Sequence, residues 1–166
     1  MASVLEAKNV TKVFGGGFLS REEENVAVNN ISMSLDQKNP KIIAVAGESG
    51  SGKTTLARLL LGIASPTSGT VEFDGKDLST ISRAERREFR REVQPIFQDP
   101  YSSLNPRKTI GSIIGLPMRV QRIEDAVTIR RQVEKTMDLV GLAARHYNAY
   151  PNQLSGGQRQ RVAIAR

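Results

Sequence analysis

The chain has 166 residues, of which 39% are hydrophobic and 25% charged, a balance that is ordinary for one globular domain. It contains no cysteine, which excludes disulfide scaffolds, thiolate zinc sites and iron–sulfur clusters. No apolar run approaches the roughly 18 residues that span a bilayer, and the N-terminus lacks the pattern of a signal peptide. We therefore expect a cytoplasmic protein that does not itself cross the membrane.

The net charge of +7 admits three classes of partner: nucleic acid, anionic lipid headgroups and phosphorylated small molecules. Aromatic residues make up only 5% of the chain and tryptophan is absent. This composition disfavours a base-stacking platform for single-stranded nucleic acid. Charge alone does not choose among the three classes.

The first part of the chain is predicted to alternate strands with glycine-rich turns. We expect a strand at 4–14, a strand with one bulge at 26–35 and a continuous apolar strand at 41–46 that is buried on both faces. A helix from Lys53 to about residue 63 follows, because apolar residues recur there at helical spacing. Residues 70–75 then predict a strand that enters an Asp-Gly turn.

The remainder of the chain is predicted to be mostly helical. Ser82 and Glu85 have the spacing of a capping box for a helix that extends through Arg91. A short strand at 94–98 should follow, and Gly141 should end the second of the later helices. The helices that we expect after that strand lie at 109–120, 124–140 and 155–166.

One segment carries most of the chemical information. Residues 47–54 read GESGSGKT and match the pattern G-x-x-x-x-G-K-[ST] at every defined position. The pattern follows a predicted strand and opens a predicted helix, so its backbone N–H groups and the helix dipole would face one phosphate. Lys53 would hold the β- and γ-phosphates, Thr54 would bind Mg²⁺ and Thr55 could bind the α-phosphate. The sequence therefore predicts an ATP or GTP site built from Gly47, Ser49, Gly50, Ser51, Gly52, Lys53, Thr54 and Thr55.

A second glycine motif opens the last predicted helix. Ser155 and Gln158 have the spacing of a capping box, which on its own would make this motif purely structural. Gly156 and Gly157 argue for more, because glycine weakens the first turn that a cap would support. Open N–H groups there, together with the positive charge of the residues that follow, predict a second anion site.

These motifs resemble those of the nucleotide-binding subunits of ATP-binding cassette (ABC) transporters. In that comparison, residues 47–54 are the Walker A motif, Gln98 is the glutamine of the Q-loop and residues 154–158 are the signature motif. Phe14 matches the aromatic position that stacks on adenine. The resemblance implies an α/β fold with a P-loop NTPase core, an antiparallel β subdomain and a helical subdomain.

The resemblance also implies a division of the chain. Residues 1–166 would be the N-terminal part of a single nucleotide-binding domain: about 1–98 for the core with its β subdomain, about 99–155 for the helical subdomain, and 155–166 for the start of the signature helix. The Walker B strand, catalytic glutamate and switch histidine of the family should follow the signature helix and do not occur in the sequence. We therefore expect residues 1–166 to be catalytically inactive alone.

Functional roles are carried over from the family residue by residue. Lys53 and Gln98 would be catalytic, and Thr54 and Gln98 would complete the Mg²⁺ shell. The nucleotide would also contact Ser155, Gly156, Gly157 and Gln158, which belong to the motif that a head-to-tail partner presents. ATP and Mg²⁺ are the cofactors, and a second ABC ATPase subunit, identical or paralogous, is the partner.

Residues 97–107 are similar to the corresponding segment of oligopeptide and dipeptide importers and of their nickel and glutathione relatives. The function implied is transport-coupled ATP hydrolysis that energises an importer, foremost for peptides. Residues 101–106 would contact the transmembrane permease subunits, and an extracytoplasmic solute-binding protein would act indirectly. The subunit would sit peripherally on the cytoplasmic face of the membrane.

Alternative functions remain open at this point. The imported solute could be nickel, glutathione or another small molecule, and non-transport ABC ATPases act on DNA or on ribosomes. The DNA-handling class carries long coiled-coil or zinc-bearing insertions before the signature motif, and none is found here. The arginine-rich stretch at 83–92 is interpreted as an exposed, salt-bridged helix face rather than a nucleic-acid patch, so no nucleic-acid partner is expected.

Overall fold

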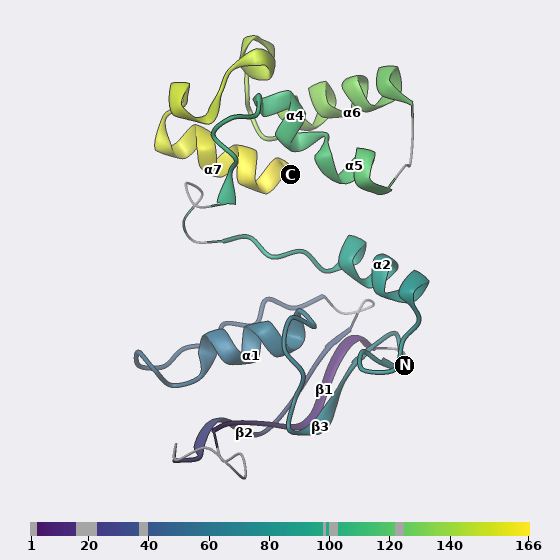
Figure 1. Ribbon diagram of the computed structural model, residues 1–166, viewed down its shortest axis with the longest axis vertical. Coiled ribbons are helices and arrows are strands. Elements are labelled where there is room, and N and C mark those ends of the chain that lie inside the picture. The colour runs from purple at the N-terminus through teal and green to yellow at the C-terminus, as the bar shows by residue number, and fades with distance from the viewer. Residues whose placement is uncertain (1–2, 16–22, 37–39, 98, 100–102, 122–124) are drawn as a thin grey trace. The chain divides into compact units, whose positions relative to one another are not determined.

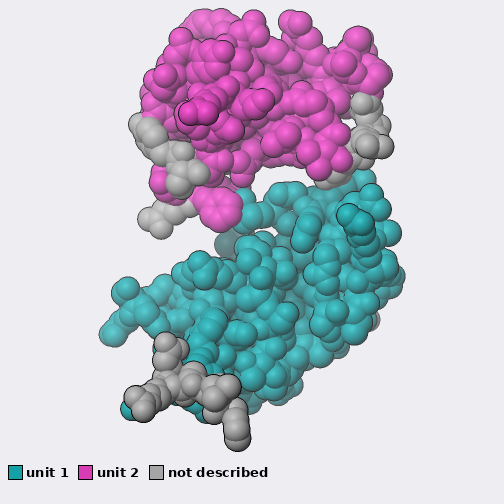
Figure 2. Space-filling view, in the orientation of Figure 1, with its two compact units in different colours: residues 1–95 teal, residues 96–166 magenta. Residues whose placement is uncertain are grey.

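The computed structural model describes residues 3–15, 23–36, 40–97, 99, 103–121 and 125–166. The chain divides into two compact units, Met1–Pro95 and Ile96–Arg166, coloured teal and magenta in Figure 2. Each unit has a hydrophobic cluster of its own.

Unit 1 is built on a four-stranded antiparallel sheet in the order β2-β1-β3-β4 (Figure 1). The strands are β1 (Ser3–Phe14), β2 (Asn25–Asp36), β3 (Ser68–Phe73) and β4 (Lys76–Asp77). The register of β1 with β2 shifts several times, which confirms the predicted irregularity of β2. The Asp-Gly pair between β3 and β4 has left-handed backbone angles, as the predicted hairpin turn requires.

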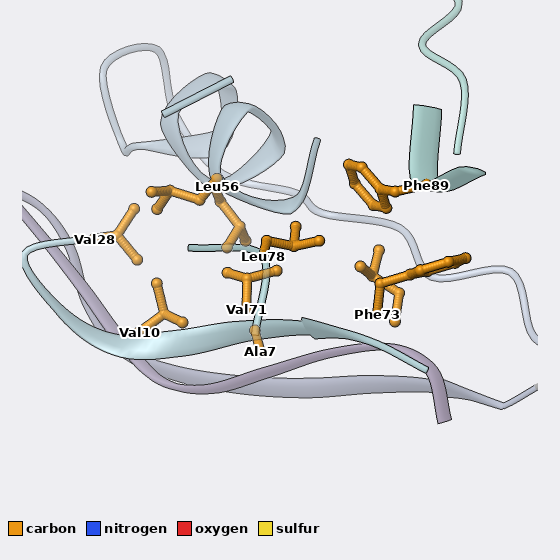
Figure 3. Close-up of a cluster of buried hydrophobic side chains, with 10 residues drawn as sticks. Ala7, Val10, Val28, Leu56, Val71, Phe73, Leu78 and Phe89 are labelled. Atoms are coloured by element: carbon orange, nitrogen blue, oxygen red, sulfur yellow. The ribbon is translucent and has the colours of Figure 1, made fainter. Parts of the chain in front are cut away.

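Helix α1 (Lys53–Leu60) covers one face of this sheet, and α2 (Arg83–Glu92) packs at its end. Figure 3 shows Leu56 of α1 pointing toward Val28 of β2, while Phe89 of α2 faces Phe73 of β3. The rings of Phe73 and Phe89 meet edge to face with centroids 5.3 Å apart. Burying an aromatic side chain such as Phe89 stabilises a fold by about 1.5–3 kcal/mol. This contact and the predicted capping box of Ser82 and Glu85 hold α2 in place.

Unit 2 contains helices packed around a second cluster of buried aliphatic side chains. Its elements are α4 (Ile110–Ile114), α5 (Leu116–Gln121), α6 (Ala126–Leu139), η1 (Ala144–Asn148), η2 (Pro151–Gln153) and α7 (Gly156–Ala165). Gly141 follows α6 with φ of 69°, the left-handed conformation expected of a residue that ends a helix. The mixture of sheet and helices agrees with the predicted α/β class.

Several predicted elements differ from the structure. Residues 41–46 do not form a strand, and Ile42 is fully exposed. A strand forms only beside a neighbour that shares its backbone hydrogen bonds, and no described segment pairs with this one. Residues 94–97 are likewise not a strand. Helix α1 ends three residues early, and the helix predicted at 109–120 divides at Gly115, which precedes Leu116-Pro117.

None of the helices among the described residues is long and apolar enough to cross a bilayer.

Candidate functional site

A cavity of about 390 Å³ in unit 1 is lined by Phe14 and by six of the eight residues predicted for the phosphate loop; Gly47 and Ser51 are not among its lining residues. It lies where the ends of β1 and β2 meet the loop that precedes α1, since Phe14 pairs with Asn25 in the sheet register. Asn25 and Ala27 of β2 were not predicted from the sequence. The cavity is lined by Phe14, Asn25, Ala27, Ser49, Gly50, Gly52, Lys53, Thr54 and Thr55.

The loop needs glycine for steric reasons. Gly50 and Gly52 have φ of 85° and 88°, in the left-handed region that other residues rarely adopt. A Cβ atom on Gly52 would lie 1.9 Å from the carbonyl oxygen of Ala27, closer than any non-bonded contact allows. The absent side chain therefore lets the start of α1 press directly against β2.

Helix α1 begins without a side-chain cap, because its N-cap residue is Gly52. Within the described part of the chain, no hydrogen bond is made by the backbone N–H groups of Lys53, Thr54 and Thr55. In four other helices, the side chain of the N-cap residue accepts a hydrogen bond from a backbone N–H of the first turn. These N-cap residues are Ser82, Thr109, Asp125 and Ser155. Three uncapped N–H groups at the positive end of a helix dipole form a site suited to an anion.

The ammonium group of Lys53 adds a full positive charge to this loop. Lys53 Nζ donates to the carbonyl oxygens of Gly47 and Glu48 at 2.8 and 2.5 Å and to Ser51 Oγ at 3.3 Å. These contacts fold the side chain back across the loop that precedes α1. A phosphate oxygen is a stronger acceptor for an ammonium group than a neutral carbonyl oxygen.

Phe14 also lines the cavity, and this residue is 47% exposed. Lys12 Nζ lies 5.2 Å from the ring centroid, at the distance of a cation–π contact. The end of β1 is fixed by Thr67, whose Oγ1 accepts from the backbone N–H of Val13 at 3.0 Å. Sequence analysis missed Lys12, although residues i and i+2 of a strand share one face.

The second predicted anion site lies in unit 2, at the start of α7. The capping box is present: Ser155 Oγ accepts from the Gln158 N–H at 3.3 Å and Gln158 Oε1 accepts from the Ser155 N–H at 2.9 Å. Gln158 is thus already engaged within the motif. Cβ atoms on Gly156 and Gly157 would meet nothing within 4 Å, so internal packing does not require either glycine.

The positive charge expected beside this motif is directed elsewhere, which corrects the sequence interpretation. Arg159 is buried and its Nε donates to the carbonyl oxygen of Pro151 at 2.5 Å. Arg161 donates to the carbonyl oxygens of Val140 and Gly141, at the C-terminal end of α6. Both guanidinium groups bind main-chain oxygens of unit 2, and so they stabilise that unit.

Three other predicted residues have different outcomes. Gln98, predicted to be catalytic and to bind Mg²⁺, lies outside the described residues. Leu104, in the predicted permease contact, is buried at 4% exposure in the core of unit 2, so this part of the prediction is wrong. Asn105 is exposed there, and its Oδ1 accepts from the Arg107 N–H at 2.9 Å. Across the described ranges, no cluster of three His, Cys, Asp or Glu side chains could hold a metal ion.

Comparison with known proteins identifies the relatives of this chain. A family model described as "ABC transporter" matches residues 28–166. The chain is 41% identical, over its whole length, to the di/tripeptide transport ATP-binding protein DppF of Pseudomonas aeruginosa (strain UCBPP-PA14). It is also 41% identical, over 91% of its length, to the nickel import ATP-binding protein NikE of Escherichia coli (strain K12). The chain spans 51% of that DppF and 56% of that NikE, about half of each relative.

Solved structures give the same result for the fold. The dimeric structure of MJ0796, a bacterial ABC transporter cassette, superposes with a TM-score of 0.79 at 30% identity over 97% of this chain and 67% of that one. CbiO1 from Clostridium perfringens, part of the ABC transporter complex cbiONQ, superposes with a TM-score of 0.77 at 25% identity over 99% of this chain and 61% of that one.

Proposed function

The chain belongs to the ABC transporter family, and on this basis we propose that the whole protein binds and hydrolyses ATP to energise an importer. The observation that carries the proposal is the cavity at residues 49–55, where three uncapped N–H groups and the Lys53 ammonium converge. A triphosphate supplies the negative charge that this arrangement lacks.

Each residue that lines the cavity has a proposed role. Phe14 stacks on the adenine ring, because its exposed face borders the cavity. Lys53 holds the β- and γ-phosphates, and the N–H and hydroxyl groups of Thr55 face the α-phosphate. Since phosphoryl transfer depends mainly on positioning and charge neutralisation, these contacts also serve catalysis.

Magnesium fits the donor set that the cavity offers. Thr54 lines the cavity beside Lys53, and its hydroxyl oxygen is a hard ligand of the kind that Mg²⁺ accepts. Gln98 is proposed as a second ligand and as the residue that responds to the γ-phosphate. The ion would neutralise charge on the phosphates, while the chain holds them against the amides of α1.

We propose peptides as the imported solute. The similarity to the di/tripeptide transport protein covers the whole chain, and residues 97–107 resemble the same segment of peptide importers. Nickel is the second candidate, because NikE is equally similar over most of the chain.

The proposed partners are a second ATPase subunit, the permease subunits and, indirectly, an extracytoplasmic binding protein. Ser155 and Gly157 at the start of α7 would contact the γ-phosphate held by the other subunit, an arrangement in keeping with the dimeric cassette among the structural relatives. Asn105 and its neighbours within 101–106, apart from Leu104, would face a permease. The protein would then be peripheral to the cytoplasmic face of the membrane.

Residues 1–166 would form the N-terminal part of a single nucleotide-binding domain, with unit 1 as the core and β subdomain and unit 2 as the helical subdomain. On their own these residues would bind nucleotide without hydrolysing it, since no described carboxylate lines the cavity to activate water. Phosphate release by purified residues 1–166 should not exceed that of their Lys53→Ala form.

The function is tested by reconstituting the complete protein with its permease and binding partners in vesicles. Peptide uptake and phosphate release should both require ATP and both be lost in the Lys53→Ala protein. Nickel uptake in place of peptide uptake would assign the second candidate. Uptake that persists at full rate in the Lys53→Ala protein would contradict the proposal.

A further inference from the structure

Helix α2 concentrates positive charge on one side. Its five arginines are spaced so that they cover about 140° of the helix circumference, at 100° per residue, and extend about 12 Å along its axis. Phe89, the buried residue of the helix, lies outside this arc and packs on Phe73. The arginines are Arg83, Arg86, Arg87, Arg90 and Arg91, and we call them the arginine face.

Within the described residues, carboxylates neutralise only one member of the arginine face, Arg91. Glu85, in the same helix, is occupied by Lys76 at 2.6 Å and by the Ser82 N–H at 2.8 Å. Arg91 pairs with Glu92 at 3.7 Å, and Arg86 donates to the carbonyl oxygen of Leu78.

The other three arginines of the face stand apart from these pairs. Arg83, Arg87 and Arg90 are exposed and make no ion pair within the described residues. The sequence interpretation of α2 is thus confirmed for its exposure and only in part for its salt bridges, which involve Glu85 and Arg91 but not these three arginines.

The spacing of the arginines makes the face repel itself. Arg83 and Arg87, Arg86 and Arg90, and Arg87 and Arg91 are each four residues apart, and like charges at this spacing destabilise a helix. Guanidinium groups bind phosphate oxygens through paired N–H groups, and a bound polyanion would relieve the repulsion. The arginine face therefore has the properties of an anion-binding surface.

We propose that the arginine face of α2 binds the phosphate groups of anionic lipids at the membrane surface. The inference rests on the proposed function in one respect, namely that the protein works beside a membrane. The cytoplasmic leaflet is negatively charged and attracts clusters of basic residues. Single-stranded nucleic acid is disfavoured, because α2 exposes no aromatic side chain on which a base could stack.

The test compares two variants of the complete protein that lose the same charge. One carries Arg83→Gln, Arg87→Gln and Arg90→Gln. The matched control carries Arg131→Gln, Lys135→Gln and Arg145→Gln, three exposed cations of unit 2. Binding is measured by sedimentation with vesicles of phosphatidylcholine alone and of phosphatidylcholine mixed with phosphatidylglycerol, at low and high salt.

The unmodified protein should bind the phosphatidylglycerol vesicles and release them at high salt. The α2 variant should bind these vesicles roughly 100-fold more weakly, whereas the control should change by less than about threefold. Equal loss in both variants, or no preference for phosphatidylglycerol, would overturn the proposal. The α2 variant could also bind the vesicles as the unmodified protein does but lose binding to the purified permease or to a duplex RNA. That result would overturn the lipid proposal and assign the arginine face to the permease or to the RNA.

Nucleotide binding separates this inference from the proposed function. Both variants should bind MgATP as the unmodified protein does, because α2 does not line the cavity. A protein that binds ATP but ignores anionic vesicles would refute the lipid inference alone.

Discussion

Lys12 Nζ lies 5.2 Å from the centroid of the Phe14 ring, on the strand that borders the candidate nucleotide cavity. Lys12 does not itself line the cavity, whereas Phe14 does. A cation against a phenyl ring at an exposed site contributes about 0.5–1 kcal/mol. If Phe14 stacks on adenine as proposed, Lys12 is expected to act as a positioning residue that holds the ring in place.

Replacing Lys12 by Met should weaken ATP binding by about two- to fivefold, the equivalent of one exposed cation–π contact. Binding of inorganic tripolyphosphate should stay unchanged, because that ligand has no ring to stack. Lys12→Arg should restore ATP binding. Titration of all three proteins with both ligands makes the comparison, and an equal loss for tripolyphosphate would show that Lys12 acts on the phosphates instead.

Substitutions of Asn105 and Leu104 should have different effects, although the two residues are neighbours in the sequence. The first should affect the coupling of ATP hydrolysis to import, and the second should affect folding. Asn105→Ala alters an exposed position and should spare ATP binding while lowering the solute imported per ATP hydrolysed. Leu104→Ala removes a buried side chain and should destabilise the protein by about 2–5 kcal/mol. Uptake, phosphate release and thermal unfolding are measured together, and a proportional fall of uptake and hydrolysis in Asn105→Ala would argue against a permease contact.

Glu85 should make the stability of α2 depend on pH. The hydrogen bond from Lys76, together with those from Ser82, lowers the pKa of Glu85 from 4.5 to about 2. A lowered pKa in the folded state means that the stabilisation is complete above pH 4.5 and is lost as the pH falls toward 2. The difference in melting temperature between the unmodified protein and Glu85→Gln should shrink over this range. A difference that grows with acidity would contradict the assignment.

Local sequence patterns predicted the parts of the structure that depend on neighbouring residues. The capping boxes at Ser82 and Ser155, the left-handed Gly141 and the phosphate-loop glycines each follow from a few adjacent residues. Such features are set by local hydrogen bonds and backbone sterics, so a motif is enough to place them.

Features that depend on distant partners were predicted less well. Residues 41–46 have the composition of a buried strand, but a strand also needs a neighbour, and no described segment provides one. Leu104 was assigned to a surface because of the motif around it, whereas packing against the helices of unit 2 buries it. The salt bridges expected within α2 are present only in part: Arg91 pairs with Glu92, whereas Glu85 pairs with Lys76 of β4.

The central claim is that the loop before α1 holds the triphosphate of ATP, and calorimetric titration of the complete protein with MgATP tests it most directly. Lys53→Ala should weaken binding by about 3 kcal/mol, on the order of 100-fold, since it leaves phosphate charge without its cation. Lys135→Ala, which removes an exposed charge from α6, should leave the affinity within about twofold. Equal affinity of the Lys53→Ala and Lys135→Ala proteins for MgATP would contradict the account.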